Sequence, residues 1–484
     1  MATEIKQLQP QVLWAYFYDL TQIPRPTGQM EQVRAYVMEQ GKKLGLETLQ
    51  DEVGNVLIRK PATPGFENKP VVTLQAHLDM VPQKNSDVKH DFSKDPIDAY
   101  IDGEFVTARG TTLGADNGIG VAIALTALAD TRLVHGPLEA LFTIDEEVGM
   151  DGANGLKSGF SKGDILVNID SEVEGNLYIG CAGGIDVNVE LEYQENTTPD
   201  DDEIGVKLSL TGLKGGHSGV DIHLGRANAN KLMARFLKEA ICDCGIRLTS
   251  FNGGNMRNAI PREAFAVITV KPEDCESLWE LVSEYQDLFI REFSGVESNI
   301  RFTAEKCDLP RHIMPEEIQD SLIHALNACQ NGVASMLSSF PDTVEASSNL
   351  SIVEAGNGKI TANFLVRSSS DSRKMWLASC IESAFLLIGA KVEMDASYTG
   401  WQPNAESHIL EIMKEVFIEF YGKEPEVKVM HAGLECGIIQ GAMPNMDMIS
   451  VGPEIRHPHS PDECVHIASV ERTYKVIAKT LGRI

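Results

Sequence analysis

The sequence predicts an α/β fold in which an outer domain with a mostly parallel sheet is interrupted by an inserted α+β domain. Two observations predict the outer domain: short apolar runs alternate with helical patterns, and this alternation returns near the C-terminus. Such runs are typical of parallel strands that are buried on both faces. The middle of the chain instead alternates apolar and polar residues, as half-buried strands do. We therefore expect one domain over residues 1–186 and 400–484, and another over residues 187–399.

The outer domain begins with helices and a hairpin. Helical periodicity at 14–23 stops at Arg25, which lies between two prolines, and a second helix is expected at 28–44. For Arg25 we favour a structural role over anion binding. A hairpin follows at 47–59. Apolar runs and helical patterns then predict strands at 71–75, 138–144, 165–169 and 446–451, and helices at 117–128 and 465–481.

The inserted domain is expected to contain two related units of the β-α-β-β-α-β, or ferredoxin-like, type. Its predicted strands are 206–210, 264–270, 350–354, 359–366 and 390–395, and its predicted helices are 226–240, 276–293 and 374–388. Asn258 and Asn349 each precede a predicted hairpin, one in each half. This echo is the reason for expecting two related units.

Composition excludes several classes of protein. The 484 residues are 43% apolar and 23% charged, which is typical of a globular protein of about two to four domains. A formal charge of −28 disfavours nucleic acid and anionic membranes as partners. We find no membrane-spanning apolar run and no signal-peptide pattern at the N-terminus. Nine cysteines without a regular spacing are typical of a reducing compartment, so we expect a cytoplasmic location and cysteines that serve packing.

Metal-ligand residue types follow each of the four apolar runs of the outer domain. They are His77 and Asp79, then Glu146 and Glu147, then Asp170, and finally His457 and His459, while Asp116 precedes a helix. Ligand sites in open α/β sheets form beyond the carboxyl ends of the strands. The acidic stretch at 145–147 alone could be a solvated turn, but the ordered set predicts a metal site. Imidazole and carboxylate without thiolate suit Zn²⁺, with Co²⁺ or Mn²⁺ as substitutes.

Charge indicates how many ions the site needs. If one divalent cation bound among five carboxylates in one pocket, a large negative charge would remain uncompensated. Two cations would leave about one negative charge, and a bridging hydroxide would favour protonation of one acid, which could then carry a proton.

Four motifs, in this order, resemble those of the M20 metallopeptidases: HLDM, GTTLGADNGIG, TIDEEVGMDGA and RHPHSPDE. The resemblance covers the whole chain. The exact residues of the four motifs are similar to those of the aminoacyl-histidine (carnosine-type) dipeptidases, a branch of this family. It implies a zinc-peptidase catalytic domain, an inserted lid domain, and hydrolysis of unblocked Xaa-His dipeptides, β-alanyl-histidine included. It also implies two zinc ions per chain, about 3.5–4 Å apart.

The resemblance also implies roles for individual residues. His77 and Asp170 would hold one ion, Glu147 and His459 the other, and Asp116 would bridge them. Asp79 would orient His77, Glu146 would be the general base, and the Asp116–Asn117 peptide would be cis. His459 is preferred to His457 because the family places this ligand four residues before a glutamate, here Glu463.

The inserted domain carries further residues that match the family. His217, in the sequence GGHSG, corresponds to a lid histidine that stabilises the oxyanion, although GGHSG could instead be a turn that starts a helix. Asn258 and Arg367 match substrate-contact positions, and Arg367 could pair with the dipeptide's carboxylate. In the outer domain, Gly433 precedes a short predicted helix and could let the protein backbone approach the substrate.

Other readings stay open at this point. A tripeptide aminopeptidase or an N-acyl amino acid deacylase of the same family would share these motifs. A non-catalytic peptide-binding protein would not need Glu146 together with all five metal ligands. The sequence also leaves open whether the chain is a monomer or a homodimer, because two lid units could replace a contact between subunits.

Overall fold

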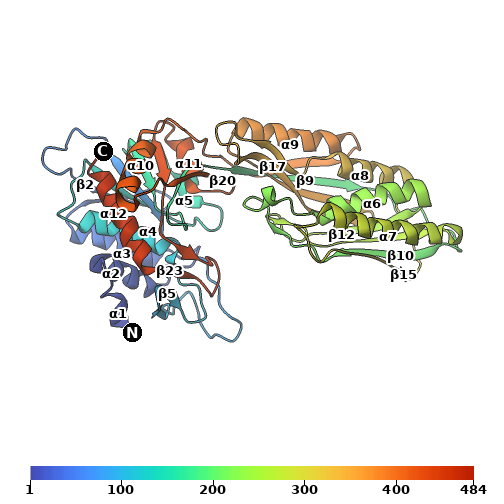
Figure 1. The fold of residues 1–484 in the computed structure, drawn as a ribbon, viewed down its shortest axis with the longest axis horizontal. Coiled ribbons are helices and arrows are strands. Elements are labelled where there is room, and N and C mark those ends of the chain that lie inside the picture. Colours follow the sequence, from blue (N-terminus) through green and yellow to red (C-terminus); the bar gives the residue numbers. More distant parts are fainter. Residues whose placement is uncertain (1) are drawn as a thin grey trace. The chain divides into compact units, whose positions relative to one another are not determined.

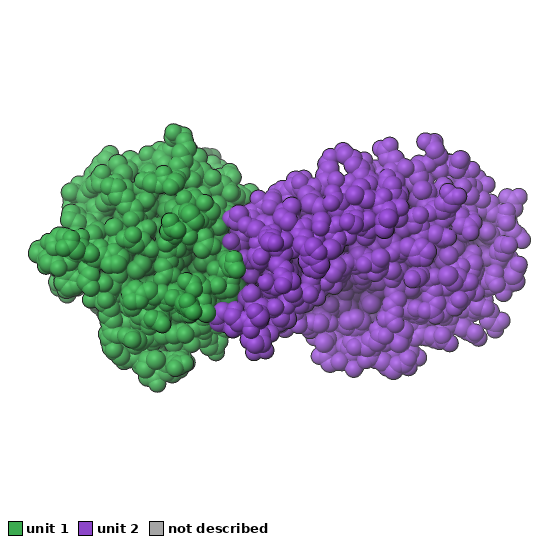
Figure 2. Space-filling view, turned by 90° about the horizontal axis from the view of Figure 1, so that it is seen from above, with its two compact units in different colours: residues 1–180, 401–429, 434–484 green, residues 181–400, 430–433 purple. Residues whose placement is uncertain are grey.

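The computed structural model describes residues 2–484, which form two compact units. Unit 1 comprises residues up to 180 together with 401–429 and 434–484, and unit 2 comprises residues 181–400 and 430–433 (Figure 2). The sequence analysis placed this boundary between residues 186 and 187, which is six residues after its position in the structure. Strand β9 (Gly183–Glu192) begins before the expected boundary and pairs along its whole length with another strand of unit 2.

Residues 430–433 are a second correction, because the sequence analysis placed them in the outer domain. The backbone N–H of Ala182 donates to the carbonyl oxygen of Met430 at 2.9 Å, so this short segment lies against unit 2. Within the described residues, no helix is long and apolar enough to cross a membrane.

Unit 1 is built on an eight-stranded mixed sheet with the order β1-β2-β6-β3-β7-β21-β8-β20 (Figure 1). Its strands are β1 (Glu47–Gln50), β2 (Val56–Lys60), β3 (Val72–His77), β6 (Leu138–Thr143), β7 (Ile165–Asn168), β8 (Asn176–Cys181), β20 (Glu426–Met430) and β21 (Asp447–Ser450). The four central strands β6, β3, β7 and β21 are parallel, as the apolar runs predict. The hairpin of β1 and β2 extends the sheet in antiparallel fashion.

Helices cover this sheet. They are α2 (Gln11–Thr21), α3 (Glu31–Lys43), α4 (Ala115–Ala129), α5 (Asp151–Gly155), α10 (His408–Tyr421), α11 (Glu435–Ala442) and α12 (Ile467–Leu481). Helix α4 packs on β3 and β6 and is buried over most of its length, because α2 and α12 pack on it in turn. A separate four-stranded sheet contains β4 (Ala99–Asp102), β5 (Phe105–Ala108), β22 (Ile455–Arg456) and β23 (Cys464–His466), which the sequence analysis did not predict.

Unit 2 contains one continuous antiparallel sheet of nine strands. In addition to β9 these are β10 (Ile204–Thr211), β12 (Arg247–Gly253), β14 (Ala264–Val270), β15 (Arg301–Cys307), β16 (Gly332–Met336), β17 (Val344–Gly356), β18 (Lys359–Ser368) and β19 (Lys391–Tyr398). Four helices lie against this sheet (Figure 1): α6 (Ala229–Cys244), α7 (Cys275–Glu292), α8 (Glu316–Ala328) and α9 (Asp371–Leu386). They share a single hydrophobic core with it.

The order of the strands shows how the two halves of unit 2 are connected. The half β15-β10-β14-β12 and the half β19-β9-β18-β17 have the same β-α-β-β-α-β connectivity, and β12 pairs with β17 to join them. Because β9 precedes β10 in the chain, the first half is inserted within the second. Such nesting depends on pairing between distant strands, which local periodicity does not encode.

Candidate metal centre

The carboxyl ends of the parallel strands bring the predicted ligands together. His77 is the last residue of β3, Asp170 lies two residues beyond β7, and Glu147 lies four residues beyond β6. Asp116 stands at the start of α4, and His459 lies in the loop between β22 and β23. The Asp116–Asn117 peptide bond is cis.

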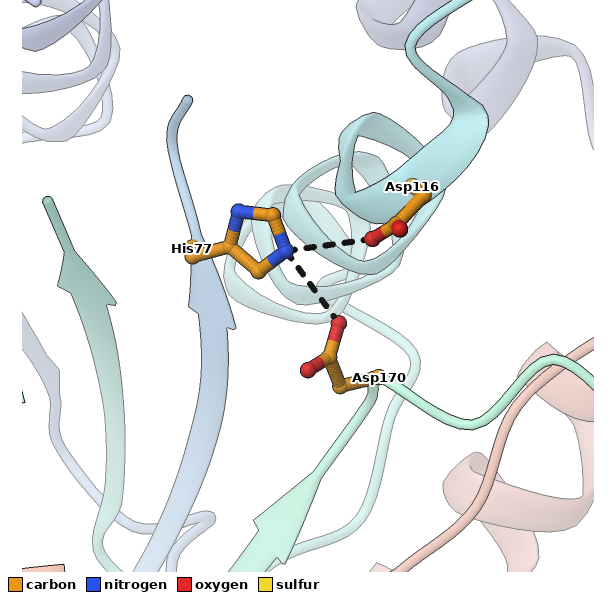
Figure 3. A group of neighbouring side chains, drawn as sticks. All are labelled: His77, Asp116 and Asp170. Carbon is orange, nitrogen blue, oxygen red and sulfur yellow. Dashed lines mark hydrogen bonds and ion pairs between the residues drawn. The ribbon is translucent and has the colours of Figure 1, made fainter. Parts of the chain in front are cut away.

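Asp116 links two histidine–carboxylate pairs through its two oxygens. Its Oδ1 lies 3.1 Å from His77 Nε2, which lies 3.4 Å from Asp170 Oδ1 (Figure 3). Its Oδ2 lies 3.1 Å from His459 Nε2, which lies 3.0 Å from Glu147 Oε2. One carboxylate is therefore shared by two separate groups of metal-ligand atoms.

These donors fit a pair of divalent cations. Two ligands of one tetrahedral zinc, each about 2.0–2.1 Å from the metal, lie about 3.3 Å apart. The four separations between donor atoms span 3.0–3.4 Å. Glu147 Oε1 is buried without a hydrogen-bond partner, which a cation would satisfy. His457, the alternative to His459, is not part of any of the three clusters found among the described residues.

Glu146 lies beside these pairs, with its Oε2 3.9 Å from His77 Nε2. Burial raises the pKa of Glu146 well above its usual range, and the charges of Asp170 and Glu147 act in the same direction. Glu146 is thus a buried carboxyl group with a raised affinity for protons, and it lies beside the ligand cluster.

Asp79 binds mainly to backbone. Its oxygens accept the N–H groups of Glu146 at 3.0 Å and Glu147 at 3.2 Å, and the hydroxyl of Thr27 at 2.9 Å. His77 Nδ1 lies 3.3 Å from Asp79 Oδ1, but without the geometry of a hydrogen bond. Although burial acts to raise the pKa of Asp79, His77 and the Glu146 N–H lower it to about 2. Asp79 therefore holds the segment that carries Glu146 and Glu147.

Two further buried acids belong to this site, although the sequence analysis assigned them no role. Glu463 accepts the backbone N–H groups of Leu113, Gly114 and Asp116 at 2.7–3.1 Å, so it anchors the loop of the shared carboxylate. Burial and the charge of Asp116 raise the pKa of Glu463 to about 7. Glu435 begins α11 and is fully buried. The family spacing pointed to Glu463, whereas no local signal marks Glu435.

In unit 2, GGHSG is followed by a short 3₁₀ helix at Ile222–Leu224, and not by the long helix from residue 220 that the alternative required. Gly216 and His217 form β11, which pairs with β13 (Ala259–Ile260), and α6 begins only at Ala229. His217 Nδ1 accepts the backbone N–H groups of Gly219 at 3.1 Å and Val220 at 3.0 Å. Nε2 must then carry the proton in the neutral ring. Burial and the charge of Arg367 lower the pKa of His217 to about 4, so the neutral form persists at pH 7.

The other predicted substrate residues lie in the same unit. Arg367 is 5% exposed; its Nη1 donates to the Tyr398 hydroxyl at 2.9 Å, while its buried Nε has no hydrogen-bond partner. Asn258 is exposed, and its carbonyl oxygen accepts the N–H of Ser218 at 2.8 Å. Gly433 belongs to the segment 430–433, in which His431 Nε2 lies 2.7 Å from Ser347 Oγ.

Known proteins resemble this chain over its full length. The family described as Peptidase family M20/M25/M40 matches residues 73–483. A cytosol non-specific dipeptidase of Escherichia coli (strain K12) is 47% identical over 482 residues, covering 100% of this chain and 99% of that protein. A crystal structure of aminoacylhistidine dipeptidase from Vibrio alginolyticus is 46% identical with a TM-score of 0.94, covering 99% of this chain and 98% of the other. Aminopeptidase PepT from Bacillus cereus ATCC 10987 shares the fold, with a TM-score of 0.57 at 15% identity over 98% of each chain.

Proposed function

This chain belongs to the peptidase family M20/M25/M40 and is a hydrolase of peptide bonds, and we propose that it is a zinc-dependent dipeptidase of the Xaa-His type. Its substrates would be unblocked dipeptides with C-terminal histidine, β-alanyl-histidine among them. The observation that carries the proposal is Asp116, whose two oxygens lie between the His77–Asp170 and His459–Glu147 pairs beside Glu146. Unit 1 would be the catalytic domain and unit 2 the lid.

We assign two zinc ions per chain to this cluster, held by His77 and Asp170, by His459 and Glu147, and by Asp116 between them. Bound zinc lowers the pKa of water and polarises a carbonyl group. Asp79 would orient His77, whose Nδ1 lies 3.3 Å from Asp79 Oδ1. It also positions the backbone of Glu146 and Glu147.

Glu146 is our general base. It would take a proton from the attacking water at its carboxylate and then deliver that proton to the nitrogen of the leaving amine. Its burial and its place beside the ligands, rather than among the closest donor pairs, support this role.

We assign the substrate contacts to residues of unit 2. His217 would donate its Nε2–H to the oxyanion, and the two backbone bonds to Nδ1 support this because they place the ring proton on Nε2. Arg367 would pair with the C-terminal carboxylate, since a buried arginine with a partner-free Nε favours an anion. Asn258 would contact the substrate, and Gly433 would let the protein backbone approach it.

A broader dipeptidase is the second candidate, and the printed name of the E. coli relative, non-specific dipeptidase, favours it. The test is a hydrolysis panel of Xaa-His dipeptides, β-alanyl-histidine, dipeptides without histidine, tripeptides and N-acylated amino acids. We expect the Xaa-His dipeptides to have the highest kcat/KM. Equal rates for all dipeptides would remove the histidine preference, and faster cleavage of tripeptides or N-acylated amino acids would replace the dipeptidase proposal.

We also propose a cytoplasmic location, which the word cytosol in the name of the E. coli relative supports. Fractionation of cells should recover the chain and its dipeptidase activity in the cytosol.

A further inference from the structure

Arg25 is a buried cation behind the metal ligands. It follows α2 and is 2% exposed. Its Nη1 donates to the carbonyl oxygens of Leu78 and Asp79, both at 3.0 Å, and its Nη2 donates to the carbonyl oxygen of Gly114. One guanidinium group therefore joins the segment that follows His77 to the loop that carries Asp116.

The surrounding backbone leaves room for this group only because two residues are glycines. A Cβ atom at Gly114 would lie 2.5 Å from Arg25 Nη2, and one at Gly118 would lie 2.6 Å from it. Glu463 accepts the N–H of Gly114 while Arg25 binds its carbonyl oxygen, so opposite charges hold the same residue from two sides. The chain is thus shaped around the guanidinium.

The charge of Arg25 matters because its neighbours are acidic. Asp79, Asp116, Glu147 and Glu463 are all close enough to interact with it electrostatically. Carboxylates gathered in a buried site repel one another unless positive charge lies among them. An arginine supplies that charge permanently, because its guanidinium does not lose its proton in proteins.

We propose that Arg25 is a positioning residue that acts as a resident counter-charge and keeps the ligand loops assembled when the metals are absent. Arg25 and the metal ions would then share the neutralisation of the same carboxylates. This inference rests on the metal centre proposed above. Its consequence is that a chain without the charge of Arg25 depends more strongly on zinc for its stability.

The test compares the melting temperature of the full chain with zinc bound and after chelation, at pH 7.5. Arg25→Met removes the charge and the hydrogen bonds, whereas Arg25→Lys keeps the charge and loses the planar fork. We expect Arg25→Met to widen the gap between zinc-loaded and chelated protein by at least about 3 °C, with chelated protein losing more. Arg25→Lys should lower both temperatures and leave the gap unchanged. Arg59→Met is the matched control, because Arg59 bonds Glu139 at 2.8 Å, away from the metal ligands; its gap should equal that of the wild type.

Each possible result either supports or overturns the proposed role of Arg25. If the difference in melting temperature between zinc-loaded and chelated Arg25→Met equals that of the wild type, Arg25 is merely structural. If the difference is smaller than in the wild type, Arg25 shapes the site for metal and does not replace the charge of the metal. If Arg25→Met does not fold with zinc present, Arg25→Gln replaces it under the same criteria, and failure of both to fold with zinc would overturn the proposal. If zinc does not raise the melting temperature of the wild type, the metal centre itself fails, which is a different result.

Discussion

Gln75 Nε2 donates a 2.6 Å hydrogen bond to Glu435 Oε2 and so joins two residues that are 360 positions apart. Gln75 Oε1 accepts the Asn168 amide at 2.6 Å, and Asn168 Oδ1 accepts the Ser450 hydroxyl at 2.5 Å. Gln75 and Asn168 each precede a predicted metal ligand, His77 or Asp170, by two residues. Alternate residues of a strand share a face. The buried polar row of Glu435, Gln75, Asn168 and Ser450 therefore lies next to the predicted ligands, on the same face of the sheet.

Replacing Glu435 with leucine should destabilise unit 1. The change removes an acceptor of Gln75 and of the Thr143 hydroxyl, which bonds Glu435 at 2.7 Å. One N–H of Gln75 then loses its partner, and the Thr143 hydroxyl keeps only the more distant carbonyl oxygen of Ala76, at 3.5 Å. We expect a loss of about 1–3 kcal/mol in the free energy of unfolding, measured by denaturant titration. Glu435→Gln retains an acceptor oxygen and should lose less. Equal losses in the two variants would contradict this account of the row.

Replacing Glu146 with glutamine should abolish proton transfer while the metals stay bound. The amide cannot accept the proton, so we expect kcat to fall by about 10²- to 10⁴-fold, with an unchanged zinc content by elemental analysis. The control is Glu52→Gln, since Glu52 is an exposed acid paired with Lys157. Near wild-type hydrolysis by Glu146→Gln would show that another group is the base, and loss of zinc would show that Glu146 is a ligand.

Removal of metal should lower the stability of the chain. Elemental analysis of purified protein should find close to two zinc ions per chain, and chelation should lower the melting temperature because the clustered carboxylates then repel. Addition of zinc should restore it. Full activity with one ion per chain would refute the two-metal site, and an unchanged melting temperature would refute the clustered ligands.

Unit 2 should lose stability as the pH falls below 6.5, and His431 should contribute to this loss. Burial and the charge of Arg367 lower the pKa of His431 from 6.5 to about 3. Below pH 6.5 the unfolded chain binds a proton at His431 that the folded chain does not, so the free energy of unfolding decreases as the pH falls. Above pH 6.5 the contribution of His431 to the free energy of unfolding is constant.

The measurement is the free energy of unfolding from pH 7 to pH 4.5. His431→Gln offers Ser347 a polar partner without titrating, so its stability should fall less steeply, by up to about 1.4 kcal/mol per pH unit. Parallel curves for the wild type and the variant would rule out a buried neutral His431.

Much of the site could be predicted because its residue types follow local patterns. A buried strand is recognisable from a short apolar run, and the first residues beyond it must lie at the carboxyl edge of a parallel sheet. His77, Glu147 and Asp170 were found in this way. Asp116 begins a helix and His459 lies in a loop, so neither directly follows a parallel strand. The order of the motifs and the resemblance to a family were needed to include them.

The sequence by itself determined the α/β class, the discontinuous outer domain and the donors available to a metal, because these depend on short-range periodicity and on residue type. Only the tertiary structure decided which oxygen of Asp116 faces which histidine, that Arg25 is a buried cation, that Glu435 ends a row of buried polar side chains, and that one half of unit 2 is nested in the other. Each of these depends on contacts between segments far apart in the chain. Local propensity carries no record of such pairings, since they arise only when the packed core brings those segments together.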